Sequence, residues 1–452
     1  MTHALKLEHL SKNTRARVQA DATRRFSTEH RTLLMSLLKW TALGSLVGVL
    51  TGSASALFLW SLDHVTATRE ANPWLLFFLP VGGMVIGWLY QRFGQLAGRG
   101  NNLIIDNLHG SDEGVPLRMA PMILFGTLVT HLLGGSVGRE GTAVQMGGSL
   151  ADSLARALHL KKDDRRLLLM SGVSGGFASV FGTPLAGTIF GLEFAQTGVV
   201  RYDGLVPCLV AALVGNQVAH LWGVRHTGYS MGDIPPFSAS VFAKVALAGL
   251  AFGLAALLFA EMLHLMKRLF AALVPSPILR PAVGGLVVIA LVYLVRTRDY
   301  IGLSESVIRA AFAGDVSGIP FFWKTLFTAV TLGAGFQGGE VTPLFLVGST
   351  LGNALSRPLS LPTPFLAGLG FVAVLAGAAN TPLACIVLGV ELFGGGALPY
   401  LAVACVFAYV FSGHHGVYSA QRVGVPKSRS LRVPDGATIG AVHEREPEPV
   451  GR

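Results

Sequence analysis

Gly138-Arg139-Glu140-Gly141-Thr142 recurs, with changes, 200 residues further along the chain as Gly338-Gly339-Glu340-Val341-Thr342. Each copy runs on to a second shared pair, Gly148-Ser149 in the first and Gly348-Ser349 in the second. A glycine-rich motif that carries a carboxylate and occurs twice in an apolar chain is typical of a membrane transporter built from two related halves. Because the substrates of such transporters bind where the halves meet, Glu140 and Glu340 are the leading candidates for functional residues.

A second repeated pattern follows each copy of the motif. Thr183-Pro184-Leu185-Ala186 and Glu193 reappear as Thr381-Pro382-Leu383-Ala384 and Glu391, at an offset of 198 residues. Both glutamates come late in short apolar segments that are too short to cross a bilayer alone. We expect Glu193 and Glu391 to be structural residues that satisfy the backbone donors of neighbouring broken helices.

The composition is that of a polytopic membrane protein. Of 452 residues, 51% are hydrophobic and 13% are charged, whereas an average soluble domain carries about 25% charged residues. Apolar stretches that can span a bilayer, or nearly so, recur at residues 33–59, 74–89, 205–221, 241–266 and 282–294. We therefore predict an all-α polytopic membrane protein with two repeats of inverted topology and with broken and re-entrant helices.

The net charge of +10 is concentrated in the first 31 residues, in residues 161–166 and in the C-terminal tail. The positive-inside rule places these segments in the cytoplasm, so we expect an inner-membrane protein with both termini cytoplasmic. We expect these charges to contact lipid headgroups, and we expect no nucleic-acid partner. The three cysteines lie in apolar runs without metal-ligand or disulfide spacing, and the chain has no nucleotide-binding motif, so we predict no metal and no cofactor.

Changes in composition divide the chain into three parts. Residues 1–31 form a polar cytoplasmic segment, residues 32–418 the transmembrane domain, and residues 419–452 a charged tail that we expect to be disordered. Within the transmembrane domain the repeat halves are predicted at about residues 32–224 and 239–412, joined by a loop that contains Pro235-Pro236.

The chemistry of the first motif points to an anion site. Glycines ahead of a helix start leave backbone N–H groups free, and these donors together with the helix dipole bind anions. The run that follows Thr142 is predicted to be that helix. A carboxylate there, Glu140, would compete with a transported anion for the same donors and would leave when protonated. The alternative is that Glu140 is an ordinary carboxylate at a helix N-cap that faces water.

The motifs resemble those of the CLC family of chloride channels and anion/proton exchangers. Gly138-Arg139-Glu140-Gly141 is similar to the family's GREGP-type motif, and Gly338–Pro343 is similar to its GGIFAP-type motif. Gly100-Asn101-Asn102 stands where the family usually has GSGIP, and Tyr418 stands where it keeps a central tyrosine. The resemblance runs from about residue 33 to residue 420, and it implies a homodimer in which each subunit has its own pathway.

The departures from the family pattern point to one branch. Thr142 replaces the usual proline, Asn101 replaces the usual serine, and Glu340-Val341 replaces the usual Ile-Phe. The internal proton-relay glutamate of chloride exchangers would fall near Phe194 and is absent. This combination is similar to that of the fluoride/proton antiporters of the family.

The resemblance implies a set of anion-binding residues beside the gating, proton-carrying Glu140. Fluoride is small and tightly hydrated, so its site must offer several strong donors. Asn101 has an amide, Thr342 a hydroxyl and Tyr418 a phenol, and Val341 leaves more room than a phenylalanine. The set is Asn101, Gly138, Arg139, Gly141, Val341, Thr342 and Tyr418.

Other candidates have a structural and a functional interpretation. Glu340 either helps to couple fluoride and proton movement or caps the helix that begins near Thr342. We expect His131 to be a packed histidine and Arg139 to form a structural pair next to the gate.

We therefore expect fluoride and protons as substrates and fluoride export driven by proton import. One alternative is a chloride/proton antiporter or a chloride channel. Another is an intramembrane enzyme that uses Glu140 and His131 as acid and base, which the lack of a nucleophile motif disfavours.

Overall fold

The computed structural model describes residues 12–443 except 315, 317, 318, 429, 431, 432 and 435. The described chain is almost wholly helical, as its composition predicts. Within the described residues, four stretches are long and apolar enough to cross a membrane: Thr28–Ala71, Pro73–Leu108, Tyr202–Leu221 and Ala239–Leu273. Shorter apolar helices are Met119–Leu132, Leu279–Val295, Thr363–Ala379, Pro382–Phe393 and Gly395–Phe411.

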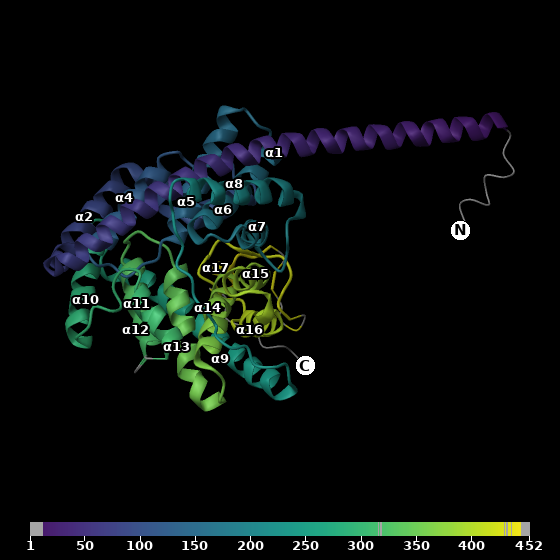
Figure 1. Ribbon diagram of the computed structural model, residues 1–452. Helices are drawn as coiled ribbons and strands as arrows, with labels where there is room; N and C mark the ends of the chain where they lie inside the picture. Colours follow the sequence, from purple (N-terminus) through teal and green to yellow (C-terminus); the bar gives the residue numbers. More distant parts are fainter. Residues whose placement is uncertain are drawn as a thin grey trace.

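The first half begins with α1, a single helix of 60 residues whose N-terminal part projects away from the body (Figure 1). The predicted boundary at residue 31 falls inside this helix. The elements in order are α1 (Lys12–Ala71), η1 (Pro73–Phe78), α2 (Leu79–Leu89), η2 (Tyr90–Gly94), η3 (Gln95–Arg99), α3 (Asn101–Leu108), α4 (Met119–Leu132), α5 (Glu140–Ala157), α6 (Lys162–Phe181), α7 (Pro184–Glu193), β1 (Gln196–Thr197), η4 (Tyr202–Gly204) and α8 (Leu205–Leu221).

The second half follows a loop without helix or strand over residues 222–238. Its elements are α9 (Ala239–Leu273), α10 (Leu279–Val295), α11 (Glu305–Ala313), α12 (Pro320–Gly333), α13 (Val341–Leu359), α14 (Thr363–Ala379), α15 (Pro382–Phe393), η5 (Gly395–Ala397) and α16 (Leu398–Phe411). After α16 come β2 (Arg422–Val423) and α17 (Ile439–His443).

The same neighbour relations occur in both halves. Helix α5 packs on α6 and α13 on α14; α6 packs on α8 and α14 on α16; α1 packs on α8 and α9 on α16. Across the halves α7 packs on α15. The repeat that the sequence shows is therefore a repeat of packing as well.

Glycines allow the closest of these helix crossings. A β-carbon on Gly147 of α5 would collide with the carbonyl oxygen of Gly172 on α6. In the other half, Gly348 of α13 and Gly370 of α14 meet in the same way. Small residues let helix backbones approach closely, which is the usual basis of packing in a bilayer, where burial of apolar surface gives no net gain.

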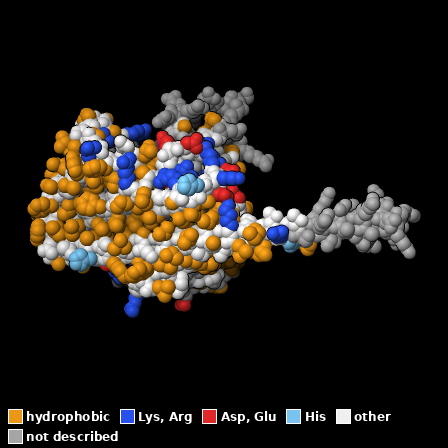
Figure 2. Space-filling view, turned by 90° about the horizontal axis from the view of Figure 1, so that it is seen from above, with side chains coloured by type: hydrophobic (Ala, Val, Ile, Leu, Met, Phe, Trp, Pro, Cys, Tyr) orange, Lys and Arg blue, Asp and Glu red, His pale blue; other side chains and the backbone are white. Residues whose placement is uncertain are grey.

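The outer surface is apolar. Large side chains such as Trp74, Leu247, Leu286 and Leu294 are more than half exposed. Figure 2 shows hydrophobic side chains over most of the visible face, with charged residues gathered near the point where the N-terminal helix leaves the body. A soluble protein rarely exposes an apolar surface of this extent, so this surface fits contact with lipid.

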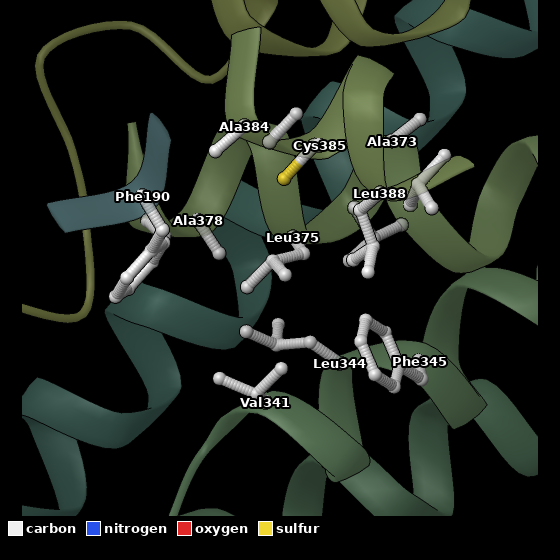
Figure 3. Packing of buried hydrophobic residues seen from close by; sticks show 14 of the residues in the cluster. Phe190, Val341, Leu344, Phe345, Ala373, Leu375, Ala378, Ala384, Cys385 and Leu388 are labelled. Carbon is white, nitrogen blue, oxygen red and sulfur yellow. The ribbon is translucent and has the colours of Figure 1, made fainter. Parts of the chain in front are cut away.

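One interior cluster of apolar residues contains side chains from both halves. Within it, Val341, Leu344 and Phe345 from α13 face Leu375 of α14 (Figure 3). Phe190 from α7 and residues of α15 belong to the same cluster. The start of α13 is thus anchored in a packed core.

The chain beyond α16 turns back onto the body. Val417 N donates to Ala378 O at 2.9 Å, and β2 pairs in parallel with β1. Ile439 in α17 is fully buried, and its N–H donates to Gln421 O at 2.8 Å. Our expectation of disorder from residue 419 is wrong for the described part of the tail, because backbone hydrogen bonds to the body order it. Residues 444–452 lie outside the described residues.

Candidate functional site

The two copies of the glycine motif meet in space. Gly138 N donates to Gly339 O at 2.6 Å, and Gly339 N donates to Gly138 O at 2.8 Å. This antiparallel bridge joins the residues just before α5 to those just before α13. It brings two helix starts, each with unpaired backbone donors, to one place between the halves.

Glu140 is 1% exposed and is the first residue of α5, yet its carboxylate reaches the start of α13. The Thr342 hydroxyl lies 2.6 Å from Oε1 and 2.7 Å from Oε2. Oε2 also accepts hydrogen bonds from Thr342 N at 3.1 Å and from Arg139 N at 3.2 Å. The sequence led us to expect the carboxylate at the start of its own helix; it lies instead at the helix start of the other half, where the donors and the dipole of α13 favour an anion.

Arg139 links this carboxylate to Glu305, the first residue of α11. Its Nε lies 3.5 Å from Glu140 Oε1, and its Nη1 lies 3.4 Å from Glu305 Oε1. The side chain of Arg139 is 18% exposed. Arg139 therefore forms the structural pair that we expected, with Glu305, and also places positive charge beside Glu140. Sequence analysis missed Glu305, because it belongs to no motif and its partner Arg139 lies 166 residues earlier in the chain.

Glu340 lies near the start of α5, across from its own helix. A β-carbon on Gly141 would be 3.2 Å from Glu340 Oε2 and 3.4 Å from Asn101 Nδ2, so these three residues lie together. Glu340 Oε2 is buried and has no hydrogen-bond partner among the described residues. A buried oxygen without a donor is unfavourable as a carboxylate and favours a proton or a bound partner there.

Asn101 and Tyr418 reach the same region from α3 and from the tail. Asn101 opens α3 and is 6% exposed, and its Oδ1 has no hydrogen-bond partner within the described part of the chain. Tyr418 is 3% exposed, and its ring meets Phe194 edge to face at 5.0 Å. The charges of Glu340 and Glu140 both act on the Tyr418 phenol.

Val341 differs from the other sequence candidates. Its side chain is 2% exposed and points into the apolar cluster at the start of α13 (Figure 3). Thr142, which the sequence set apart as a departure, is fully buried, and its Oγ1 lies 2.7 Å from Thr127 Oγ1. Thr127 carried no sequence signal, because a threonine in an apolar helix is common.

Glu193 and Glu391 cap each other's helices. Glu193, at the end of α7, accepts from Leu383 N and Ala384 N at the start of α15, at 3.2 and 2.9 Å. Glu391 in α15 accepts from Leu185 N and Ala186 N at the start of α7, at 3.0 and 2.7 Å. These contacts support the structural interpretation, and they require α7 and α15 to run antiparallel, as inverted repeats demand.

His131 is fully buried in α4, and neither ring nitrogen has a hydrogen-bond partner in the residues that the structure describes. Its ring is not hydrogen-bonded to Glu140, whose contacts are with Thr342 and Arg139. Across the described chain no group of three or more His, Cys, Asp or Glu residues could hold a metal ion.

Comparisons with known proteins agree with this arrangement. The family model described as voltage gated chloride channel matches residues 82–413. A protein of Pseudomonas syringae pv. tomato named chloride/fluoride channel protein is 52% identical over 406 residues, covering 88% of this chain and 90% of its own length. The H(+)/Cl(-) exchange transporter ClcA of Vibrio vulnificus is 27% identical, covering 86% of this chain and 88% of its own length.

A solved structure is also similar. The crystal structure of a CLC-type fluoride/proton antiporter superposes with a TM-score of 0.83 at 34% identity, over 86% of this chain and 99% of that one. With the packing repeat and the two facing glycine motifs, these matches lead to one conclusion: the chain is an integral membrane protein that belongs to the CLC family of voltage gated chloride channels.

Proposed function

We propose that this protein exports fluoride in exchange for protons. The observation that carries the proposal is the buried carboxylate of Glu140, which occupies the donors at the start of α13. A helix start that holds a carboxylate can hold a small inorganic anion instead. The similarity to proteins named chloride/fluoride channel and fluoride/proton antiporter supports fluoride as the anion.

In the proposed cycle, protonation removes the charge of Glu140 and weakens its bonds to Thr342. The side chain then leaves, and fluoride takes the Thr342 N–H and hydroxyl. Loss of the proton returns the carboxylate and expels the anion. Because carboxylate and fluoride exclude each other from one site, the two fluxes are coupled, and an inward proton gradient drives fluoride outward.

Further candidate residues near the bridge between the halves complete the proposed pathway. We assign anion contacts to Asn101 and Tyr418, and to the backbone of Gly138 and Gly141. Glu340 holds the proton in transit, since its Oε2 is buried without a donor in the described structure. It thus stands in for the relay glutamate whose place Phe194 takes.

The test is a proteoliposome that carries the purified protein and reports fluoride efflux and proton uptake together. The wild-type protein should move both ions in a fixed ratio. Glu140→Gln should leave fluoride efflux without proton uptake, because the amide cannot carry a proton. Proton pumping against fluoride by this variant would refute the assigned role of Glu140.

Chloride transport is the second candidate, because one similar protein has chloride in its name and another is a proton/chloride exchanger. The same liposomes loaded with equal concentrations of either halide separate the two. Faster efflux of chloride than of fluoride would overturn the substrate that we propose. An intramembrane enzyme has no support in the geometry, because Glu140 and His131 are not hydrogen-bonded to each other.

The family resemblance also supports a homodimer, and the positive charge of the terminal segments supports an inner-membrane protein with both termini on the cytoplasmic side. A cysteine placed at residue 3 and labelled in intact cells by a membrane-impermeant reagent tests the orientation. Labelling only after the membrane is opened is the expected result. Cross-linking in native membranes, followed by mass determination, tests the dimer.

A further inference from the structure

Gln421 lies just past the membrane domain and uses its whole side-chain amide in hydrogen bonds to the body of the protein. The side chain is fully buried. Its Nε2 donates to Phe194 O and to Ala379 O, each at 3.0 Å, and its Oε1 accepts from Asn380 Nδ2 at 3.0 Å. Both amide donors and the amide oxygen are thus in use.

The partners of Gln421 are the ends of one helix from each half. Phe194 follows the last residue of α7, and Ala379 is the last residue of α14. Carbonyl groups at helix ends lack partners within the helix. One side-chain amide therefore satisfies helix ends of both halves, and it fixes Phe194, whose ring faces Tyr418.

Asn102 also holds this tail segment. Its Nδ2 donates to Ser419 Oγ at 3.1 Å, and its Oδ1 accepts from Ala420 N at 3.1 Å. Asn102 follows Asn101, which lies beside Gly141 and Glu340. Asn102 and Gln421 thus hold the three residues that directly follow Tyr418.

We propose that Gln421 is a positioning residue that, with Asn102, holds the Tyr418 ring against Phe194 in the fluoride path. This inference rests on the proposed anion contact of Tyr418. A ring that is edge to face with its neighbour can present its hydroxyl to an anion in a fixed place only if the backbone on both sides is held. The bond from Val417 N to Ala378 O holds the residue before Tyr418, and the two amides hold the residues after it. Loss of the Gln421 amide leaves two carbonyls unpaired and frees that backbone.

The test replaces Gln421 by Met, which has a similar length but no hydrogen bonds. Asn353→Leu is the matched control, because Asn353 is also a buried amide and donates to Ala311 O at 2.8 Å, away from the tail. We expect Gln421→Met to raise the KM for fluoride about fivefold to tenfold and to lower the proton-to-fluoride ratio. The control should lose thermal stability to a similar degree while KM and ratio stay unchanged.

The same change in a Tyr418→Ala background separates this inference from the proposed function. If Gln421 acts through Tyr418, Gln421→Met adds little to the effect of Tyr418→Ala. Independent, multiplying effects would overturn the positioning role, as would a Gln421→Met protein whose transport matches that of the control. A Tyr418→Ala protein with normal fluoride KM would instead refute the anion contact. Should Gln421→Met fail to fold, the half-buried Asn102→Ala carries the same expectations.

Discussion

Thr342 gives the Glu140 carboxylate two donors, its backbone N–H and its hydroxyl. The two come from the first turn of α13, where the helix dipole adds to their effect. Glu340, one residue before α13, instead has an oxygen that is buried without a partner among the described residues. The two carboxylates of the repeat therefore differ: both oxygens of Glu140 accept hydrogen bonds, whereas Oε2 of Glu340 has no donor among the described residues.

Thr342→Val should weaken fluoride binding, because it removes the hydroxyl and keeps the shape. We expect the KM for fluoride to rise about tenfold or more, since a hydrogen bond to a charged group contributes roughly 1.5–3 kcal/mol. Fluoride efflux from liposomes at graded concentrations measures it. The control is Thr350→Val in the same helix, whose hydroxyl bonds Leu346 O. Equal KM values in the two variants would rule out the hydroxyl as an anion ligand.

Glu340→Gln should lower the number of protons moved per fluoride while fluoride still passes. The reason is that the amide keeps the volume of the side chain but cannot take up and release a proton. Simultaneous recording of pH and fluoride in liposomes gives the ratio. An unchanged ratio would leave Glu340 with the capping role that the sequence also allowed.

At the scale of elements, α7 and α15 form a mutually capped pair. Each helix ends near a glutamate that accepts two backbone N–H groups at the start of the other. A cap of this kind satisfies orphan donors and complements the helix dipole at once. The pair fixes where α7 ends, and so fixes Phe194 and the ring that Tyr418 meets.

Glu391→Ala should destabilise the protein by about 1–2 kcal/mol, the usual cost of losing a helix cap. Transport per folded molecule should keep its proton-to-fluoride ratio, because Glu391 is bonded to helix starts and not to the site. Thermal unfolding in detergent and the liposome ratio measure the two effects. Stable protein with altered coupling would show that the cap has a role in transport.

At the scale of the whole molecule, glycine crossings hold each half together. The approach of Gly348 to Gly370 leaves no space for a β-carbon, whereas Gly395 has no other atom within 4 Å of its β-carbon position. A larger residue at a crossing must push two helices apart. The starts of α5 and α13 would then lose their register across the bridge between the halves.

Gly348→Ala should therefore destabilise the fold by about 1–3 kcal/mol through overpacking. Gly395→Ala, in open space, is the matched control and should be close to neutral. The yield and thermal stability of the two purified variants give the comparison. Equal stability of the two variants would mean that α13 and α14 can move apart at this crossing without loss of stability.

The local sequence predicted much of the architecture. Apolar stretches predicted the all-helical membrane fold, and the repeated motifs predicted two related halves with both glutamates near their meeting point. The prolines and glutamates of the second repeat predicted helices that need caps. All of these are local or periodic features, and the chemistry of a residue and its near neighbours is enough to recognise them.

Composition was a poor guide to the tail. The tail from residue 419 carries charges and prolines, which favours disorder, yet Gln421 is held by Phe194 at the end of α7 and by Ala379 of α14, and β2 pairs with β1. The same holds for Glu305, whose pairing with Arg139 joins segments far apart in the chain.

Glycines, glutamate and threonine in that order were enough to predict a carboxylate at a helix start in the membrane, because such a segment supplies free backbone donors. No local feature predicts that Glu140 reaches the helix start of the opposite half. This contact depends on how the two halves pack across Gly138 and Gly339, and a contact between residues 202 positions apart is not encoded in any local pattern.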